Sequence, residues 1–236
     1  MNSTIEQKQN KGQGSLPQKK KEKKVKGYFF YDFVKITGCI PMMLFLRTKV
    51  ICTGETKPSK VRGGAIISSN HFSFMDPVVV YSAFWNRRVL SVATKDLYSS
   101  PAKDFFFTHL HCIKVDKENF TMDTFHKVRE GLKKEKLVLI FPEGQVNRDA
   151  DKGMLAFKSG AILMAHQCNK PIIPVYIVKR GSWRERQVIM IGDPVDVRKL
   201  CGPMPSMAQL DRASEYLHEK EVELLNKYEE IKNKKK

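Results

Sequence analysis

His71 and Asp76 are the two side chains in this sequence whose types and spacing fit acid–base chemistry. An imidazole titrates near neutral pH, so His71 is suited to take a proton from an attacking hydroxyl group. A neighbouring carboxylate such as that of Asp76 would fix the tautomer of the ring and stabilise the imidazolium that forms. The alternative is structural: Asp76 would only cap a helix that starts at Pro77, and His71 would only end a strand. The pair therefore needs support from the rest of the chain.

The surrounding sequence predicts an α/β arrangement that would hold the pair in place. Apolar runs predict strands at residues 65–69, 88–94, 112–115, 137–141, 172–178 and 187–191. Helical patterns alternate with them at residues 77–85, 101–110, 121–134 and 154–166, and a charged helix runs from residue 207 towards the C-terminus. We therefore predict an α/β fold with a mixed, largely parallel sheet flanked by helices.

In sheets of this kind ligands bind beyond the carboxyl ends of the strands. The His71 loop leaves such an end, and so does the Phe-Pro-Glu-Gly run at residues 141–144. We expect the two loops to share one cleft.

The composition narrows the classes of partner. The chain has 236 residues, 42% of them hydrophobic, which is enough for one domain with a substantial core. A formal net charge of +17 indicates anionic partners, meaning nucleic acid, an anionic membrane or phosphate-bearing substrates. The five cysteines are scattered and never spaced as CxxC, so neither a disulfide framework nor a zinc site is indicated. We expect reduced thiols in a cytosol-facing protein, and neither a metal nor another cofactor.

The N-terminal region divides into two segments of opposite character. Residues 1–26 are polar and end in a lysine-rich run, so we expect a disordered basic tail. Residues 27–52 are crowded with apolar side chains, but two charged residues and the pair Gly38 and Pro41 interrupt the roughly 20 apolar residues that a membrane span needs. We predict a pair of short helices, bent between Gly38 and Pro41, that lies in the membrane interface; a buried pair and a true span are the alternatives. Residues 53–236 would form the globular domain.

Several motifs together make the sequence resemble the glycerolipid acyltransferases typified by the 1-acyl-sn-glycerol-3-phosphate (lysophosphatidate) acyltransferases. The first signature of that family, Asn-His followed by four residues and Asp (the HX4D motif), stands at residues 70–76. The third, Phe-Pro-Glu-Gly, is intact at residues 141–144. The fourth, Pro-Ile-x-Pro-Val, stands at residues 171–175, and Phe-Lys-x-Gly at residues 157–160 is also similar to the family pattern. The resemblance covers roughly residues 28–196.

The second signature of the family departs in this chain. It normally ends in an arginine thought to hold the phosphate of the acceptor, and Lys117 stands in that place. Lysine keeps the charge but lacks the planar, two-pronged guanidinium, which puts the strength or selectivity of phosphate recognition in doubt. After Gly144 the family often has Thr-Arg, whereas here Arg148 follows two residues further on and is the expected substitute.

The resemblance implies an enzyme that moves a fatty acyl group from acyl-CoA or acyl carrier protein to the sn-2 hydroxyl of 1-acyl-sn-glycerol-3-phosphate, forming phosphatidate in phospholipid biosynthesis. It implies that His71 is the catalytic base and that Asp76 orients it. It also implies a peripheral or monotopic protein at the cytoplasmic face of an anionic membrane, with a lysophospholipid as acceptor. An ester on Ser73 is the weaker mechanism, because no Gly-x-Ser-x-Gly elbow surrounds that residue.

The substrate-binding residues that the resemblance implies are motif positions or basic side chains. They are Asn70, Lys95, Lys117, Phe141, Pro142, Glu143, Gly144, Arg148 and Lys158. Two roles are open for Glu143. It would be a carboxylate that binds a glycerol hydroxyl of the acceptor, or a loop residue that binds local backbone amides. The basic side chains are the candidates for the phosphate.

Two other functions remain open on the sequence alone. The acceptor would be a different lysophospholipid, glycerol-3-phosphate or a lyso-amino-acid lipid if Lys117 changes phosphate recognition. Alternatively, the chain would be a non-catalytic basic adaptor that binds membrane or nucleic acid through its tail and N-terminal helices. Nucleic acid is not expected if the resemblance holds.

Overall fold

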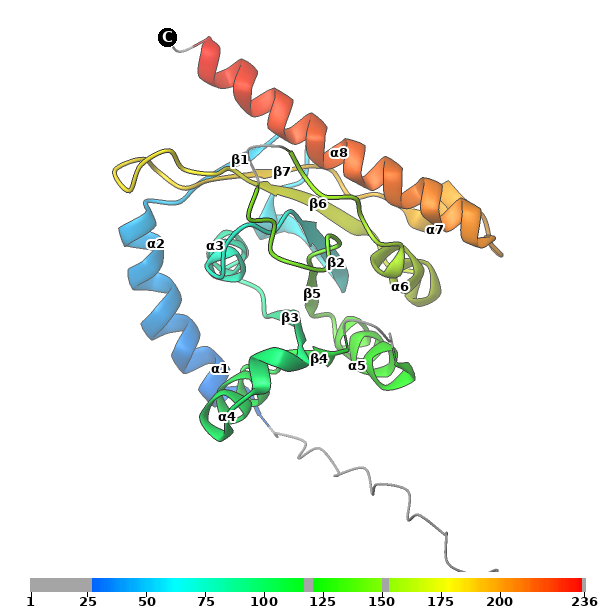
Figure 1. The fold of residues 1–236 in the computed structure, drawn as a ribbon, viewed down its shortest axis with the longest axis horizontal. Coiled ribbons are helices and arrows are strands. Elements are labelled where there is room, and N and C mark those ends of the chain that lie inside the picture. The colour runs from blue at the N-terminus through cyan, green and yellow to red at the C-terminus, as the bar shows by residue number, and fades with distance from the viewer. Residues whose placement is uncertain (1–26, 117–120, 150–152, 235–236) are drawn as a thin grey trace, which may run out of the picture.

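The computed structural model describes residues 27–116, 121–149 and 153–234, and within these ranges the chain forms a sheet with helices on both faces (Figure 1). The strands are β1 Lys49–Cys52, β2 Ala65–Ser69, β3 Val89–Thr94, β4 Ile113–Val115, β5 Leu137–Ile140, β6 Ile172–Ile177 and β7 Val188–Ile191. The α-helices are α1 Phe29–Val34, α2 Ile40–Leu46, α3 Asp76–Ala83, α4 Pro101–His109, α5 Met122–Lys133, α6 Gly160–Cys168, α7 Val197–Cys201 and α8 Met207–Asn233. Short 3-10 turns occupy Pro58–Lys60 and Lys95–Tyr98. The basic tail expected at residues 1–26 lies outside the described residues.

The sheet has the strand order β1-β7-β6-β2-β5-β3-β4. Each neighbouring pair is parallel except β6 and β7, so the prediction of a mixed, largely parallel sheet flanked by helices is confirmed. Ser68 of β2 lies opposite Ile140 of β5, and Ser69 lies opposite Val175 of β6. Since β2 and β5 end at the same level of the sheet, the loops that follow them begin side by side.

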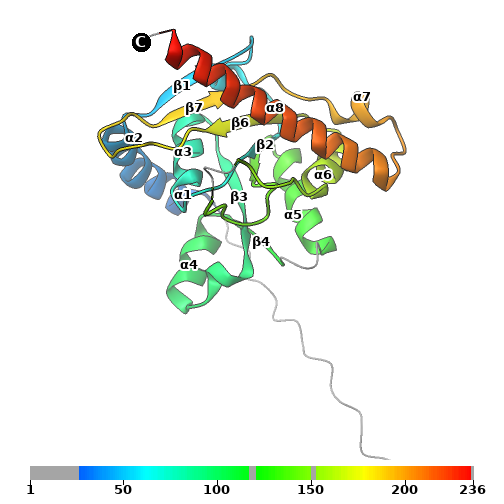
Figure 2. The same cartoon turned by 45° about the horizontal axis from the view of Figure 1, so that its top comes forward.

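Two hydrophobic cores fill the two faces of the sheet. Alternation along β2 sends Ile67 to the face covered by α3 and the end of α2, and sends Ile66 to the face covered by α5, α6 and α8. Every residue of β2 is buried, as a central parallel strand requires. The long helix α8 also packs across β6 and β7, as both views of the fold show (Figures 1 and 2). The strand that leads to His71 is therefore enclosed on both faces.

The predicted strands are found within one or two residues of their expected bounds. The prediction of a helix at residues 154–166 was wrong about where that helix starts. Helix α6 begins only at Gly160. The backbone N–H of Leu155 donates to the carboxylate of Glu143, and that of Lys158 donates to the carbonyl of Pro142. These tertiary hydrogen bonds hold the preceding segment in an irregular conformation, which overrides its local helical preference.

The apolar N-terminal segment is a single interrupted helix rather than the predicted bent pair. A π-helical turn at Lys35–Cys39 joins α1 to α2, and its flanking residues keep right-handed helical dihedral angles. Proline lacks a backbone N–H, so Pro41 cannot bond to the carbonyl four residues earlier, and a π turn accommodates that gap. The helix covers Phe29–Leu46, 18 residues of mean hydropathy 1.5, and by length and composition alone it is sufficient to cross a membrane.

The sheet also begins earlier than expected, because β1 at Lys49–Cys52 lies inside the segment assigned to membrane association. It pairs in parallel with β7. The short helix α7 was not predicted either. Helix α8 starts at Met207 as predicted and is capped by Ser206, whose hydroxyl accepts the N–H of Gln209.

Candidate active site

His71 and Asp76 meet at the carboxyl end of β2. The Nδ1 atom of His71 lies 2.9 Å from Oδ2 of Asp76, whose side chain is only 2% exposed. The same carboxylate oxygen accepts hydrogen bonds from the backbone N–H groups of Phe72 and Ser73, both at 2.8 Å. Asp76 is the first residue of α3 and not its cap, since Met75 occupies the cap position. The loop therefore folds around the carboxylate, and the carboxylate fixes the orientation of the ring.

The loop after β5 closes against the His71 loop. The ring of Phe141 stacks on the His71 ring with centroids 4.0 Å apart and an angle of 16° between the planes. Glu143 is 4% exposed. Its Oε1 accepts the backbone N–H of His71 at 2.9 Å, and its Oε2 accepts that of Leu155 at 3.1 Å. The structure therefore shows Glu143 as a loop residue that binds local backbone amides, which was the second role considered for it. Burial raises the pKa of Glu143, and the two amide hydrogen bonds oppose that shift.

Gly144 and Lys158 complete this turn. Gly144 has a φ of +71°, which glycine adopts without strain, and its N–H donates to the carbonyl of Phe141 at 3.0 Å. The Lys158 side chain lies directly against Gly144, because a Cβ added there would come within 3.1 Å of the Lys158 Nζ atom. The backbone N–H of Lys158 donates to the carbonyl of Pro142 at 2.9 Å. The Lys158 side chain therefore stands beside the turn in an exposed position.

Asn70 and Asn147 bond the two loops to neighbouring backbone groups. The side-chain amide of Asn70 donates to the carbonyl of Ile177 at 3.0 Å, and its oxygen accepts the Ile177 N–H at 2.8 Å. Asn147 donates its backbone N–H to the carbonyl of His71 at 2.7 Å and its side-chain amide to that of Gly153 at 2.8 Å. Asn70, which the resemblance assigned to substrate binding, is thus engaged with the backbone of β6 and supports the His71 loop.

Glu221 of α8 lies buried behind the His71 loop, and the sequence analysis missed it. It is 0% exposed, and its Oε1 accepts the hydroxyl of Ser68 at 2.6 Å. Burial raises the pKa of Glu221 well above its ordinary value; the charge of Glu143 adds to the shift, and hydrogen bonds from Ser68 and the Asn70 backbone oppose it. The available signal was its spacing from Leu217 and Leu224, which places Glu221 on the apolar stripe of α8.

A small hollow opens between the two loops. It is lined by Asn70, His71, Phe72, Glu143, Asn147, Gly153, Met154 and Tyr176. Burial, with smaller contributions from the charges of Glu143 and Glu221, raises the pKa of Tyr176 to about 12. Tyr176 was not predicted because its strand reads as ordinary apolar sequence.

The other predicted substrate residues lie further from His71 or beyond what the structure describes. Lys95 follows β3, two positions along the sheet from β2, and its ammonium pairs with the carboxylate of Asp116. Arg148 is exposed on the loop next to Asn147. Lys117 lies outside the described residues. Among the residues that are described, no three His, Cys, Asp or Glu side chains form a group that could hold a metal ion.

Known proteins resemble this chain in sequence and in fold. A family model described as Acyltransferase matches residues 49–178, from the first residue of β1 to just beyond β6. The 1-acyl-sn-glycerol-3-phosphate acyltransferase of Haemophilus influenzae is 32% identical over 143 residues, which cover 56% of this chain and 58% of that protein. The proteins of the same name from Limnanthes douglasii and Saccharomyces cerevisiae are 28% identical over 160 residues and 30% identical over 151 residues.

These two matches cover 61% and 63% of this chain, and 53% and 46% of the two relatives. The chain therefore spans about half the length of the relatives that it matches. Among solved structures, PlsC, the 1-acyl-sn-glycerophosphate acyltransferase of Thermotoga maritima, matches with a TM-score of 0.59 at 21% identity, over 83% of this chain and 79% of that one. The two proteins share a fold.

Proposed function

Because the chain belongs to the Acyltransferase family, we propose that it transfers a fatty acyl group from acyl-CoA or acyl carrier protein to the sn-2 hydroxyl of 1-acyl-sn-glycerol-3-phosphate, forming phosphatidate. The names of the matched relatives support this acceptor. The observation that carries the proposal is the 2.9 Å contact between His71 and Asp76 beside the Phe141–Gly144 turn.

In this proposal His71 is the general base. Since Nδ1 faces the Asp76 carboxylate, the neutral ring carries its proton on Nδ1 and leaves the lone pair of Nε2 free to accept. Nε2 takes the proton of the acceptor hydroxyl as that oxygen attacks the thioester carbonyl carbon. The C–S bond then breaks, the ester remains on the acceptor, and the imidazolium returns its proton to the departing thiolate. General-base catalysis of this kind contributes about 10²–10⁴ in rate.

The neighbouring side chains would position the base and the anionic substrate. Phe141 holds the plane of the imidazole, and Glu143 holds the His71 backbone at the height of the turn. Lys158 stands beside that turn, and the exposed Arg148 lies further along the same connection between β5 and α6, so these two cations are the best placed for the phosphate of the acceptor or the donor. The hydroxyl of Ser73 accepts the N–H of Met75 at 3.2 Å, which gives an ester on Ser73 no support.

We also propose that the chain works as a peripheral or monotopic protein at a membrane surface, with the helix at Phe29–Leu46 as the membrane-associating segment, the residues from β1 onwards as the catalytic domain and residues 1–26 as a basic tail. The polar side of the helix faces the protein. The Tyr31 hydroxyl donates to the Val89 carbonyl at 3.0 Å and accepts the Val89 N–H at 2.9 Å.

Two charged residues of the helix face the protein as well. Asp32 receives two hydrogen bonds from the guanidinium of Arg88, at 3.0 and 2.6 Å, and Lys35 donates to the carbonyl of Arg87. Asp32 and Lys35, the charged residues that interrupt the apolar run, therefore attach the helix to the surface of the domain. The opposite side of the helix is apolar and exposed: Phe29, Phe33, Ile36, Ile40, Leu44 and Phe45. An amphipathic helix held in this way suits the membrane interface better than a span.

The test of the proposed reaction is thiol release by detergent-solubilised protein supplied with lysophosphatidate and an acyl thioester, with the product identified by mass spectrometry. We expect phosphatidate from the wild type and a rate about 10²–10⁴ lower from His71→Ala. Circular dichroism would check that the variant is folded. Equal rates for the two proteins would overturn the proposal.

A panel of acceptors would test the identity of the lysolipid separately. The reason to include it is Lys117, which stands where the family has arginine. Lysophosphatidate should give the fastest thiol release. A faster reaction with glycerol-3-phosphate, another lysophospholipid or a lyso-amino-acid lipid would keep the acyltransferase chemistry and reject this acceptor.

A further inference from the structure

The loop between β6 and β7, residues 178–187, displays an aromatic side chain on an ordered turn. Trp183 is 71% exposed, and the guanidinium of Arg184 lies 5.4 Å from the centre of its ring. The Glu185 carboxylate accepts the N–H of Gly181 at 2.9 Å, and the Glu185 N–H donates to the Ser182 carbonyl at 3.2 Å. Hydrogen bonds within the loop therefore hold the Trp183 ring at the surface of the molecule.

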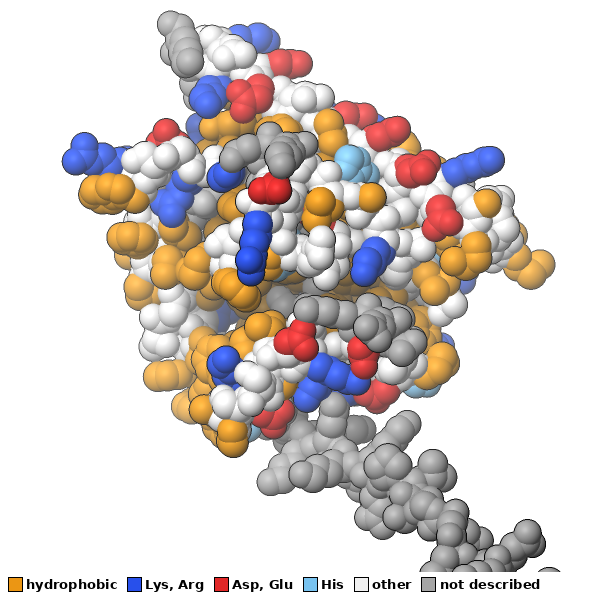
Figure 3. All heavy atoms as spheres, in the orientation of Figure 1, with side chains coloured by type: hydrophobic (Ala, Val, Ile, Leu, Met, Phe, Trp, Pro, Cys, Tyr) orange, Lys and Arg blue, Asp and Glu red, His pale blue; other side chains and the backbone are white. Residues whose placement is uncertain are grey.

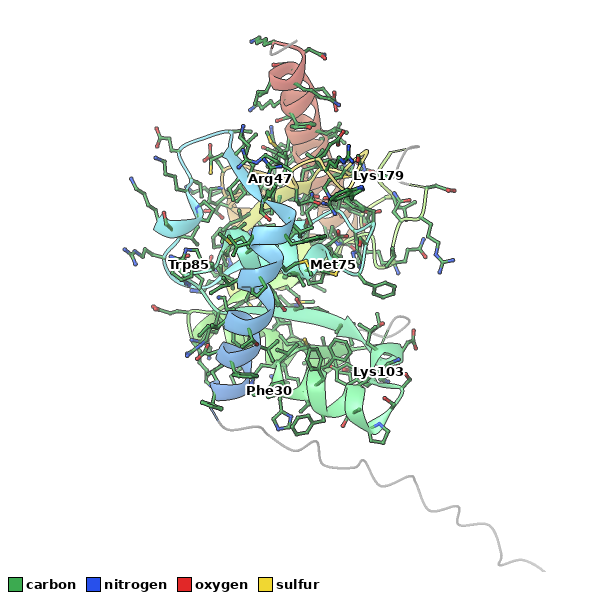
Figure 4. All side chains as sticks on the ribbon, turned by 90° about the vertical axis from the view of Figure 1, so that its left-hand side faces the viewer. Phe30, Arg47, Met75, Trp85, Lys103 and Lys179 are labelled. Carbon is green, nitrogen blue, oxygen red and sulfur yellow. The ribbon has the colours of Figure 1, made fainter. Side chains whose placement is uncertain are left out.

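This loop is joined to the C-terminal end of the apolar helix. The N–H of Gln187 donates to the Leu46 carbonyl at 2.9 Å, and the N–H of Lys49 donates back to the Gln187 carbonyl at 2.7 Å. The Nε of Arg186 donates to the Arg47 carbonyl at 3.3 Å. Figure 1 shows the loop projecting past the end of α2, and Figure 4 shows Arg47 at that end of the helix. The loop and the helix are therefore neighbouring parts of one face.

The other end of the helix continues the same face onto α4. The ring of Phe30 contacts those of Phe105 and Phe106 at centroid distances of 5.6 and 6.1 Å, and both α4 rings are partly exposed. We call this face the apolar flank; it consists of the exposed side of residues 29–46, the loop at residues 178–187 and the two α4 rings. Figure 3 shows hydrophobic side chains along this edge of the molecule, at the left of the view.

The shape and the charge of the apolar flank fit a lipid bilayer that contains anionic lipids. The helix has 18 residues and is about 27 Å long, and its exposed apolar side can lie along the surface of a bilayer. Residues 179–186 contain four basic residues and one acid, and tryptophan and arginine are residues that suit the level of lipid headgroups. A second copy of the chain would bring two bodies of formal net charge +17 together, which opposes self-association.

We propose that the β6–β7 loop is a second membrane contact, in which Trp183 enters the headgroup region of an anionic bilayer on the same side as the apolar helix. This inference rests on the proposed membrane association and deepens it. A helix alone leaves the protein free to roll about the helix axis. A second contact beside the end of the helix removes that freedom and fixes the tilt of the domain on the membrane.

Fluorescence of single-tryptophan variants tests the contact directly. The chain has two tryptophans, so Trp85→Phe leaves Trp183 as the reporter. With vesicles of phosphatidylcholine and phosphatidylglycerol, we expect the Trp183 emission to move to shorter wavelength and to be quenched when the lipids carry brominated acyl chains. Vesicle-bound protein with unchanged Trp183 emission would overturn the proposal, as would a failure of the protein to sediment with these vesicles.

Sedimentation with the same vesicles measures the strength of the contact. Trp183→Ala should weaken vesicle binding about tenfold, which corresponds to the loss of one large apolar side chain from the interface. Met204→Ala is the matched control, because Met204 is 91% exposed and follows α7, which Figure 1 shows at the opposite end of the molecule from the β6–β7 loop. Equal binding by Trp183→Ala and wild type would reject the loop contact, as would a change in oligomeric state without a change in vesicle binding.

Charge reversal tests the choice of anionic lipid. Arg184→Glu should weaken binding to vesicles with phosphatidylglycerol more than Lys199→Glu, an exposed control on α7. Equal effects of the two variants would reject the electrostatic part. The ratio of activity on vesicles to activity in detergent separates this proposal from the proposed reaction. For Trp183→Ala, this ratio should fall below that of the wild type. A wild-type protein that is inactive in detergent, but whose Trp183 emission is quenched by brominated lipids, would count against the reaction alone.

Discussion

The His71 loop and the apolar flank distribute polar and apolar side chains in opposite ways. Around His71, the carboxyl groups of Asp76, Glu143 and Glu221 are buried and bonded to backbone amides or hydroxyls. On the helix at residues 29–46, large apolar side chains are exposed, and the polar side chains of Tyr31, Asp32 and Lys35 bond to the rest of the protein. Both arrangements reverse the ordinary preference of the residue types.

The physical consequence differs between the two regions. Buried carboxyl groups with fixed partners are costly to move, so the His71 loop is a rigid site of defined geometry. Exposed apolar groups have no fixed partner and gain free energy only when another apolar phase covers them. We infer that the first region is built for chemistry on one atom and the second for contact with an extended surface. The predictions below separate loss of chemistry from loss of structure.

Among the variants considered below, Asp76→Asn should have the largest effect on activity. An amide oxygen still accepts the backbone N–H groups of Phe72 and Ser73, but it cannot stabilise the imidazolium of His71. We expect thiol release to fall on the order of 10²-fold or more, with little change in stability. Adding His71→Ala to this variant should cost little further, because the two residues act as one unit. Full additivity of the two losses would separate Asp76 from the base.

Glu143→Ala should have the largest effect on stability. It removes the acceptor of two N–H groups, those of His71 and Leu155, which are partly shielded from water. We expect the free energy of unfolding to fall by about 2 kcal/mol in urea denaturation, with loss of activity as the loops separate. Glu215→Ala, an exposed acid on α8, is the control. Equal stability of Glu143→Ala and wild type would show that the carboxylate does not hold the loops together.

Glu221→Gln should change how stability depends on pH. Because burial raises the pKa of Glu221 above its ordinary 4.5, the folded protein keeps a proton that the unfolded chain releases, so stability falls as pH rises above about 4.5. The variant lacks this proton and should gain stability relative to wild type by at most about 1.4 kcal/mol per pH unit in that range.

Urea denaturation at a series of pH values measures that difference. Glu219→Gln, on an exposed position of the same helix, should follow the wild type at every pH. Parallel curves for Glu221→Gln and wild type would mean that the buried carboxyl does not retain its proton.

Tyr31→Phe should have the smallest effect. It removes the hydroxyl that bonds both the N–H and the carbonyl of Val89, which holds the apolar helix on the domain. We expect a loss of about 1 kcal/mol in the free energy of unfolding. Phe33→Leu, on the exposed side of the same helix, should stay within about 0.5 kcal/mol of wild type in the absence of lipid. A larger loss from Phe33→Leu would show that the exposed side has a partner within the protein.

The sequence predicted much of this structure because its local signals agree with the fold. Strand β2 is a run of apolar residues that ends in polar ones, and its predicted range of residues 65–69 matches the structure. The spacing of His71 and Asp76 and the Phe-Pro-Glu-Gly run predicted two loops at one edge, and the loops are joined there by the hydrogen bond between Glu143 and the His71 N–H. These features are local, so neighbouring residues are enough to specify them.

The misses come from interactions between residues far apart in the chain. The segment before α6 carries helical residues, but hydrogen bonds to Glu143 and Pro142 hold it out of a helix. Asp32 and Lys35 read as breaks in an apolar run, yet they are the side chains that hold the helix to Arg88 and to the Arg87 carbonyl. In both cases, contacts with residues distant in sequence gave the segment a structure that its local pattern did not predict.

The order of strands and helices, the two loops and the strong positive charge were determined by the sequence, because each depends on residue type and short-range spacing. Only the tertiary structure decided that Glu221, 150 positions after His71, lies buried behind the catalytic loop, and that Trp183 lies on a loop joined to the end of the apolar helix. The reason is that burial and proximity depend on how the chain packs, and packing joins residues that no local pattern relates.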